Sequence, residues 1–408
     1  MSPEPAAAGG GAAAGSAPAE GADREAVSTA AGDASSVPRA LIDTAALVHN
    51  YREACRLACG GAGVLAMIKS DAYGHGARLC AAALERAGCR IFGVASVDEA
   101  RQLAEFSDRG SRVVVFGGIL AGEADAALAA GAEVVTQEID VVRALAGRAA
   151  ASGREAVVHV KLDTGMHRLG VVPDAIVEFV RAAAALRGVR IVAVCSHFAQ
   201  AESVTGGVTA GQLETMLAAD AALKAAGFSL TRHLANSAAI LARPEAHLDL
   251  VRPGIMLYGV APDPSLRGRA QLRPVMRLVA RVVRVADVAA GEGVGYGHTF
   301  HTNGASRIAT IRCGYADGYP RNLGNVAEAA IRGRRVPVAG RICMDHTMLD
   351  VTGVAGASVG DDVTLWGADP LVEEVASRAG TIAYELLARV AARVRREEAG
   401  AAEQERNS

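Results

Sequence analysis

Short runs of β-branched residues alternate with stretches rich in alanine and leucine between residues 40 and 260. This alternation predicts parallel strands joined by crossover helices. Eight such runs occur: one ending at Lys69, and the segments 90–96, 112–118, 132–137, 156–163, 190–198, 231–237 and 248–255. Eight strands within about 220 residues predict an α/β fold of the (β/α)8 TIM-barrel type. A doubly wound open sheet is the alternative, but no G-x-G-x-x-G turn opens any of the predicted helices.

The pattern changes after residue 265. Strand-like segments follow one another with turns and without long helices at 279–288, 307–314, 334–351 and 361–367, and helical stretches occur within 372–398. We therefore assign residues 38–265 to the barrel and 266–398 to a mainly β C-terminal domain. Residues 1–37, rich in Ala, Gly, Ser and Pro, are expected to form a disordered tail, and residues 399–408 a frayed one.

Composition narrows the possible partners. The 408 residues carry a net charge of -2, which provides no positive field for nucleic acid or an anionic membrane. A small molecule or another protein is the expected partner. The seven cysteines are odd in number and show no C-x-x-C spacing, so we predict neither a disulfide framework nor a zinc site. Without a signal-peptide or membrane-spanning pattern, the expected location is the cytoplasm.

Lys69 is the first residue that suggests chemistry. It ends the first apolar run and is followed by the loop SDAYGHG. In a barrel, the carboxyl ends of the strands form the catalytic face, so this lysine is expected in a desolvated pocket. Burial disfavours the ammonium form and releases an amine that can bond covalently to an aldehyde cofactor. A lysine at a strand end is otherwise a common solvated surface residue.

The segment around Lys69 resembles the cofactor-lysine motif of alanine racemases, which are fold-type III pyridoxal-phosphate enzymes. Further segments resemble the same family in the same order between about residues 37 and 395. The matching blocks are AMIKSDAYGHG, VHVKLDTGMHRLG, SHFAQAE, LANSAA, VRPGIMLYG, RCGYADGYPR, GRICMD and TIAYE. The resemblance implies a racemase that interconverts L-alanine and D-alanine for peptidoglycan synthesis.

The resemblance also implies where pyridoxal 5'-phosphate binds. Lys69 would hold the cofactor, and its other contacts would be Tyr73, His197, Asn236, Ser237, Arg252, Gly254, Ile255 and Tyr384. Most of these residues fall at predicted strand ends: Lys69 closes strand one, Arg168 follows strand five, His197 closes strand six, Asn236 and Ser237 close strand seven, and Arg252 lies in strand eight. Barrel enzymes often bind phosphate with the loops after strands seven and eight. The alternatives are a turn glycine at Gly254 and a core aromatic at Tyr73.

Arg252 bears on the mechanism, because the family places it against the ring nitrogen of the cofactor. An arginine keeps its proton near neutral pH, so it cannot fully protonate that nitrogen as a carboxylic acid could. The ring is then a weaker electron sink, which disfavours reactions that compete with racemisation. His197 is expected to hydrogen-bond and orient Arg252; a buried structural histidine is the alternative.

Racemisation requires two acid–base groups on opposite faces of the α-carbon. The resemblance assigns these roles to Lys69 and to Tyr315, with Arg168 and the backbone of Met344 at the substrate carboxylate. Tyr315 and Met344 come from the second subunit in this family, which implies a homodimer with shared active sites. Arg341 and Asp345 are expected to shape the entrance and support their loop.

Several alternatives remain open at this point. Lys161 matches a position that is carbamylated in some family members, and a salt bridge is equally possible. Racemases for serine, lysine or several amino acids differ from the alanine enzyme in pocket size. A non-catalytic cofactor-binding barrel would lack the second domain and Tyr315, and decarboxylases of this fold type place a carboxylate where Arg252 stands. The chain also lacks the apolar terminal strand of the family, which leaves the packing of its last segment open.

Overall fold

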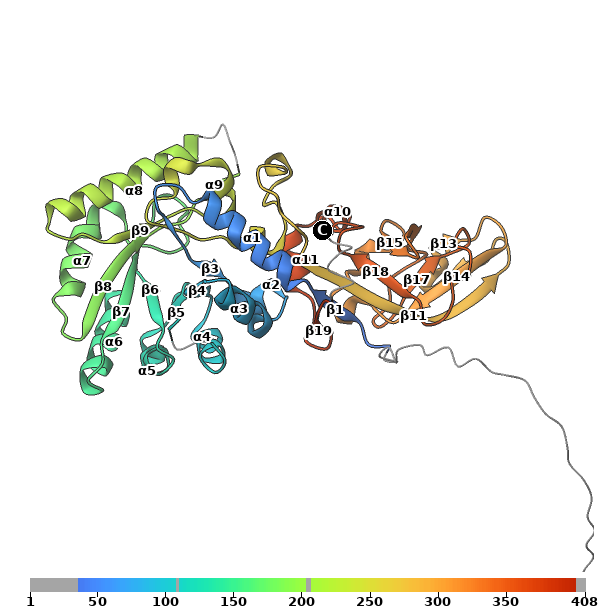
Figure 1. The fold of residues 1–408 in the computed structure, drawn as a ribbon, viewed down its shortest axis with the longest axis horizontal. Coiled ribbons are helices and arrows are strands. Elements are labelled where there is room, and N and C mark those ends of the chain that lie inside the picture. The colour runs from blue at the N-terminus through green and yellow to red at the C-terminus, as the bar shows by residue number, and fades with distance from the viewer. Residues whose placement is uncertain (1–35, 108–109, 203–206, 401–408) are drawn as a thin grey trace, which may run out of the picture. The chain divides into compact units, whose positions relative to one another are not determined.

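The computed structural model describes residues 36–107, 110–202 and 207–400, so most of the predicted N-terminal and C-terminal tails lie outside the described residues. A barrel-like sheet of nine parallel strands forms the first domain, on the left of Figure 1. In spatial order the strands are β2 (Gly63–Val64), β10 (Leu250–Val251), β9 (Thr231–His233), β8 (Val189–Cys195), β7 (Ala156–Lys161), β6 (Glu133–Thr136), β5 (Arg112–Val115), β4 (Ile91–Val94) and β3 (Ala66–Met67).

The predicted barrel is confirmed, and all eight predicted runs contribute strands to it. The first run is divided into β2 and β3, which pair with β10 and β4 and so close the ring. The strands end earlier than predicted: Lys69, His197, Ser237 and Arg252 each follow their strand rather than lie in it. The catalytic face is therefore lined by the loops just beyond the strands.

Helices surround the barrel strands in Figure 1. Their bounds are α1 (Thr44–Leu57), α3 (Ala77–Arg86), α4 (Val97–Ala104), α5 (Ala124–Ala129), α6 (Ile139–Ala151), α7 (Ile176–Ala184), α8 (Gly207–Ala225) and α9 (Ser237–Ala242). Polar residues begin several of them, as Asp43 and Ser96 accept hydrogen bonds from the first turns of α1 and α4. Buried alanines, leucines and valines on α3 and α6 recur at helical spacing and cover the sheet. None of the helices in the described part of the chain is long and apolar enough to cross a membrane.

The second domain is built mainly from strands, as predicted. Its main sheet contains β1 (Arg39–Ile42), β11 (Met276–Val288), β14 (Ser306–Ile311), β15 (Glu328–Ile331), β16 (Arg334–Pro337), β17 (Thr347–Asp350), β18 (Asp362–Trp366) and β19 (Arg395–Glu398). A separate hairpin joins β12 (Gly293–Val294) to β13 (Phe300–His301). The helices α10 (Val372–Arg378) and α11 (Ala383–Ala388) follow β18.

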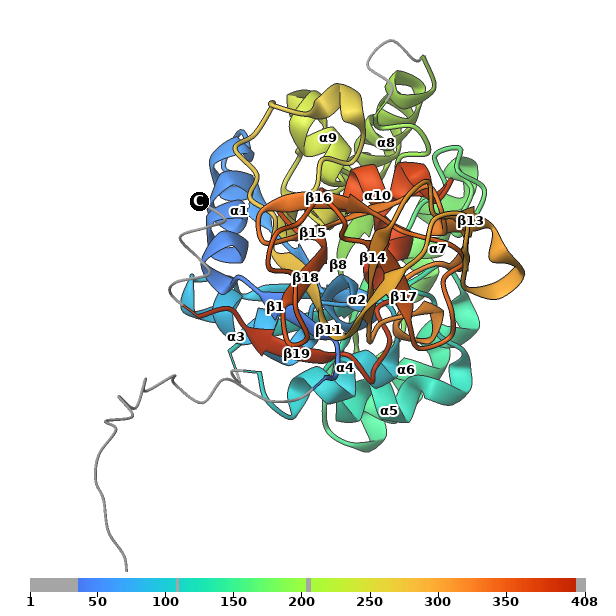
Figure 2. The ribbon, with the colours of Figure 1, turned by 90° about the vertical axis from the view of Figure 1, so that its right-hand side faces the viewer.

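The two ends of the described chain meet in this second sheet. This arrangement differs from the expected domain boundaries, which place the N-terminal end in the barrel. Strand β1 lies within residues 38–265, which we expect to form the barrel, but it pairs antiparallel with β11 and parallel with β19 (Figure 2). Strand β19 consists of Arg395, Arg396, Glu397 and Glu398, so a terminal strand is present without the expected apolar residues. Its backbone pairing with β1 is independent of side-chain polarity, which explains why the sequence pattern did not reveal it.

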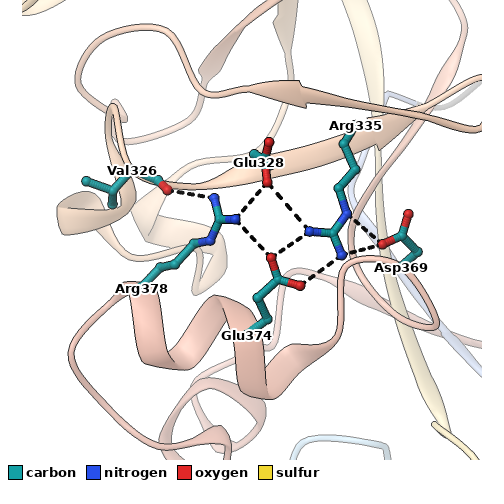
Figure 3. A network of polar contacts seen from close by, with 6 residues as sticks. All are labelled: Val326, Glu328, Arg335, Asp369, Glu374 and Arg378. Carbon is teal, nitrogen blue, oxygen red and sulfur yellow. Dashed lines mark hydrogen bonds and ion pairs between the residues drawn. The ribbon is translucent and has the colours of Figure 1, made fainter.

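An ion-pair network joins α10 to the β15–β16 hairpin (Figure 3). Glu374 accepts two hydrogen bonds from Arg335, at 2.6 and 2.8 Å, and one from Arg378 at 2.9 Å. The remaining contacts run from the two arginines to Glu328, Asp369 and the carbonyl of Val326. A carboxylate shared by two guanidinium groups is held more firmly than an isolated surface pair.

We expect Glu374→Gln to lower the free energy of unfolding by about 0.5–1 kcal/mol. Hydrogen bonding from Arg335 lowers the pKa of Glu374 in the folded state. The network therefore stabilises the folded protein at neutral pH. The difference in free energy of unfolding between the variant and the wild type should vanish as acid protonates Glu374. Thermal melts at low and high salt measure this effect. Glu373→Gln, in the same helical turn with only a 3.6 Å contact to Arg267, is the control. Equal melting temperatures for wild type and Glu374→Gln would contradict the prediction.

Candidate active site

A cavity of about 560 Å³ lies at the carboxyl ends of the barrel strands. This volume suits a cofactor or a small organic ligand. Ten of the twelve predicted site residues line it: Lys69, Tyr73, Arg168, His197, Asn236, Ser237, Arg252, Gly254, Ile255 and Tyr384. Residues from six separate stretches of the chain therefore converge on one place.

The loop after Lys69 has an unusual backbone. The segment α2 (Lys69–Tyr73) is a left-handed turn in which Ser70, Asp71, Ala72 and Tyr73 all have φ between 53° and 55°. Left-handed helical backbone costs roughly 1–2 kcal/mol for each residue that is not glycine. Contacts outside the turn must therefore hold it in place.

Three side chains supply these contacts. The Glu99 carboxylate accepts from the backbone N–H of Ser70 at 2.7 Å, and Asp71 accepts from the N–H that begins α3 at 2.7 Å. Arg396 of β19 donates to the carbonyl of Gly74 at 3.1 Å and to three carbonyls between Val390 and Val394. The C-terminal segment of the chain thus braces the loop that carries Lys69 and Tyr73.

The environment of Lys69 favours the neutral amine. Burial lowers the pKa of Lys69, the nearby Arg168 and Arg252 lower it further, and Glu99 acts in the opposite direction. At neutral pH a larger fraction of Lys69 is therefore the neutral amine than for a lysine in water. This is the electrostatic setting that the sequence predicted for a lysine at this strand end.

Hydroxyl and backbone donors gather at one end of the cavity. Ser237 accepts from the N–H of Gly254 at 2.8 Å, and a Cβ atom on Gly254 would lie 2.5 Å from the Tyr73 hydroxyl. The Tyr73 and Tyr384 rings are 6.2 Å apart. Burial raises the pKa of both phenols, so both stay protonated and able to donate. Asn236 belongs to the same stretch, where its side chain caps α9 by accepting from Ala239.

Arg252 lines the same cavity and is 4% exposed. One of its terminal nitrogens, Nη2, donates to the carbonyls of Ser196 and Leu234, and lies 3.2 Å from Nδ1 of His197. The predicted contact with His197 is therefore present. Burial lowers the pKa of Arg252 to about 10, so it stays protonated at neutral pH. The pKa of His197 falls well below its ordinary value, through burial and through Arg252, so its ring is neutral.

The second terminal nitrogen of Arg252, Nη1, contacts a residue that the sequence analysis missed. It lies 3.0 Å from Nδ1 of His233. Behind His233, a line of buried polar groups continues through His159 to Glu133. His159 is a polar residue within the apolar strand β7, whereas Glu133 begins β6 and His233 ends β9. Such positions indicate a polar group near the barrel interior, but they do not show which residues meet.

Lys161 lines the same cavity. Burial lowers the pKa of Lys161 to about 8, with Arg252 and Arg168 contributing in the same direction, so a sizeable amine fraction exists near neutral pH. Within residues 36–107, 110–202 and 207–400, no carboxylate forms an ion pair with Lys161, so the salt-bridge alternative is not the arrangement observed.

Tyr315 and Met344 lie away from this cavity, on two adjoining loops of the second domain. The loops are joined where the N–H groups of Tyr315 and Ala316 donate to the carbonyls of Cys343 and Met344. The two side chains are 42% and 54% exposed, and Tyr315 borders a separate surface hollow of about 590 Å³. One chain by itself therefore does not bring them to Lys69.

An ion pair supports these two loops. The fully buried Asp317 accepts from Arg393 at 2.7 Å and from the N–H of Gly314 at 2.9 Å. Arg393 also donates to Asp345 at 2.6 Å, which agrees with the supporting role predicted for Asp345. Arg341 lies beside Gly297 at the β12–β13 hairpin.

Comparison with known proteins matches both domains to one family. The model of the alanine racemase N-terminal domain matches residues 42–262, and that of the alanine racemase C-terminal domain matches residues 275–398. The chain belongs to the alanine racemase family. It is therefore grouped with isomerases, as the motifs around Lys69 predicted.

Proteins named alanine racemase resemble the chain over nearly its whole length. The enzyme of Chlorobaculum tepidum is 41% identical over 381 residues, covering 92% of this chain and 99% of the relative. That of Desulfovibrio desulfuricans is 42% identical over 362 residues, covering 88% and 96%. Both shares include the barrel and the strand domain, so the similarity is not confined to one of them.

Solved alanine racemase structures have the same fold. The enzyme from a D-cycloserine-producing Streptomyces lavendulae superposes with a TM-score of 0.85 at 35% identity, covering 90% of this chain and 98% of the other. The enzyme of Bartonella henselae, described with covalently bound pyridoxal phosphate, has a TM-score of 0.79 at 30% identity and covers 88% and 98%.

Proposed function

We propose that the protein interconverts L-alanine and D-alanine with pyridoxal 5'-phosphate held by Lys69, and that the D-alanine serves peptidoglycan synthesis. The observation that carries this proposal is the cavity that Lys69 and the buried Arg252 line together with the hydroxyl-bearing residues Tyr73, Ser237 and Tyr384. The lowered pKa of Lys69 suits an amine that must bond to an aldehyde. The family and the cofactor named for the Bartonella relative support it.

The residues present fit this cofactor. Ser237, the backbone of Gly254 and Ile255, and the protonated phenols of Tyr73 and Tyr384 would bind its phosphate. Arg252 keeps N–H groups that are not used by its protein acceptors, and these would face the ring nitrogen. When bound, the cofactor supplies an aldehyde for the amino group of the substrate and a ring that withdraws electrons from its α-carbon.

The proton transfers would need a second chain. Lys69, once free of the cofactor, would move the proton on one face of the α-carbon. Tyr315 of the partner subunit would act on the other face, because in a single chain Tyr315 lies in a separate hollow. Arg168 and the backbone of Met344 of the partner subunit would hold the substrate carboxylate. The proposal therefore includes a homodimer with two shared sites.

The direct test is chiral chromatography of the products formed from a panel of L-amino acids, with and without added pyridoxal phosphate. We expect D-alanine from L-alanine, dependent on the cofactor, and slower or no reaction with larger side chains. If serine or lysine reacts faster than alanine, the proposed substrate is wrong but the proposed reaction, racemisation, still holds. Release of CO2 or an amine without inversion would contradict the proposal.

Gly254→Ala tests the phosphate end of the cavity. The added Cβ would lie 2.5 Å from the Tyr73 hydroxyl, which must move. We expect the dissociation constant for pyridoxal phosphate to rise about tenfold, or about 1.4 kcal/mol. Gly147→Ala, in the middle of α6 with open space around the added atom, is the control and should leave it unchanged. Equal affinity in wild type and Gly254→Ala would favour a simple turn glycine.

A further inference from the structure

A line of buried polar side chains runs from Arg252 through the interior of the barrel. Arg252 Nη1 lies 3.0 Å from His233 Nδ1, and His233 Nε2 lies 2.9 Å from His159 Nδ1. His159 Nε2 then lies 2.8 Å from the Glu133 carboxylate. At the far end Arg112, whose side chain is 46% exposed, donates hydrogen bonds of 2.6 and 2.8 Å to the same carboxylate. The chain of contacts crosses from the loop after β10 to β9, β7, β6 and β5.

The two ends of this line decide how its hydrogen atoms are arranged. Arg252 can only donate, so His233 must accept at Nδ1 and, as a neutral ring, carries its hydrogen on Nε2. An ionised Glu133 can only accept, so His159 must donate from Nε2 and present a lone pair at Nδ1. That lone pair is what the Nε2–H of His233 requires. Each contact is therefore satisfied in a single arrangement of tautomers.

The electrostatics of the line agree with this arrangement. Burial lowers the pKa of His233 well below its ordinary value, and Arg252 lowers it further, so the ring is neutral. Burial alone would raise the pKa of Glu133, but hydrogen bonds from His159 and Arg112 outweigh it and bring the pKa to about 2. Glu133 is therefore ionised at neutral pH and accepts hydrogen bonds.

We propose that Glu133 is a positioning residue for Arg252, acting through the fixed tautomers of His159 and His233. This inference rests on the proposed function, in which Arg252 faces the ring nitrogen of the cofactor. Without the carboxylate, the Nε2–H of His159 would be buried and unpaired, which is unfavourable. Reversing both histidine tautomers relieves that cost but turns an N–H of His233 toward Arg252. The guanidinium must then shift away.

Glu133→Leu tests this inference, with histidine side-chain ¹⁵N spectra as the main measurement. In wild-type protein, with and without cofactor, we expect both His159 and His233 to be protonated at Nε2 and unprotonated at Nδ1. In Glu133→Leu we expect a fraction protonated at Nδ1. When it is loaded with cofactor, this variant should show a shifted visible absorbance. Its kcat should be about tenfold lower with little change in KM, an effect of the size seen when the hydrogen-bond partner of a functional histidine is removed.

Controls separate positioning from general stability. Arg112→Met removes an ion pair but leaves the acceptor for His159, so its tautomers should match wild type. Glu155→Leu breaks the surface pair with Arg190 and should change neither spectra nor kcat. If Glu133→Leu does not fold, Glu133→Gln replaces it: one amide oxygen must serve both Arg112 and His159, so a smaller tautomer change is expected.

Two outcomes remain distinguishable. Unchanged tautomers together with an unchanged kcat in Glu133→Leu, or in Glu133→Gln where that variant is used, would overturn the positioning role. A wild-type protein without racemase activity would instead overturn the proposed function, whatever the tautomers.

Discussion

Lys69→Ala is expected to reduce racemisation by about 10³-fold or more, the range lost with a catalytic acid–base group. The substitution removes the group proposed to hold the cofactor and the amine proposed to move the proton on one face. Chiral chromatography measures the rate, and the visible absorbance of the bound cofactor should be lost with it. A variant that keeps both the absorbance and the rate would disprove the assignment of Lys69.

The small number of lysines in the chain allows the lysine that binds the cofactor to be identified directly. The sequence contains three lysines, Lys69, Lys161 and Lys224. Borohydride reduction of the loaded enzyme followed by peptide mapping should place the cofactor on Lys69. Lys224→Ala is the matched control, because Lys224 lies on α8, paired with Asp220, and should be dispensable. A label on Lys161, which shares the cavity, would transfer the anchoring role to that residue.

Mixing two inactive variants is expected to restore activity. If Lys69 of one chain works opposite Tyr315 of the partner subunit, Lys69→Ala and Tyr315→Ala homodimers are inactive at both sites. Their mixed dimer contains one site with both residues intact. Random reassociation of equal amounts makes half of the dimers mixed, so about a quarter of wild-type activity should return. The separate position of Tyr315 within one chain motivates this expectation.

Differently tagged chains establish that mixed dimers have formed. Recovery should require conditions that allow subunits to exchange, such as coexpression. Tyr296→Ala is the control for Tyr315→Ala, because Tyr296 is a second exposed tyrosine of the strand domain, at 70% exposure. Confirmed mixed dimers without any recovered activity would rule out a shared site and leave the role of Lys69 untouched.

The barrel and the strand domain could be predicted from the hydrophobic pattern, and most residues of the cavity from the resemblance of the motifs. Hydrophobic runs of strand length separated by helical stretches report burial directly, and the residues that follow them must lie on one face of a parallel barrel. The resemblance named Lys69, His197, Ser237 and Arg252, and the strand pattern predicted that they lie on the same face. The ends of the strands shifted by a few residues, because a weakly periodic terminus does not define where pairing stops.

Features that depend on contacts between residues distant in sequence could not be predicted and are seen only in the folded chain. The left-handed turn after Lys69 is intrinsically unfavourable and exists because Glu99 and Arg396 hold its backbone. Strands β1 and β19 pair through main-chain groups, so the pattern of their side chains does not indicate the pairing. The line from Arg252 to Glu133 joins residues of separate strands, whose hydrogen-bond partners are set by the order of strands around the barrel. A sequence states which groups can donate or accept, and the fold alone decides which of them meet.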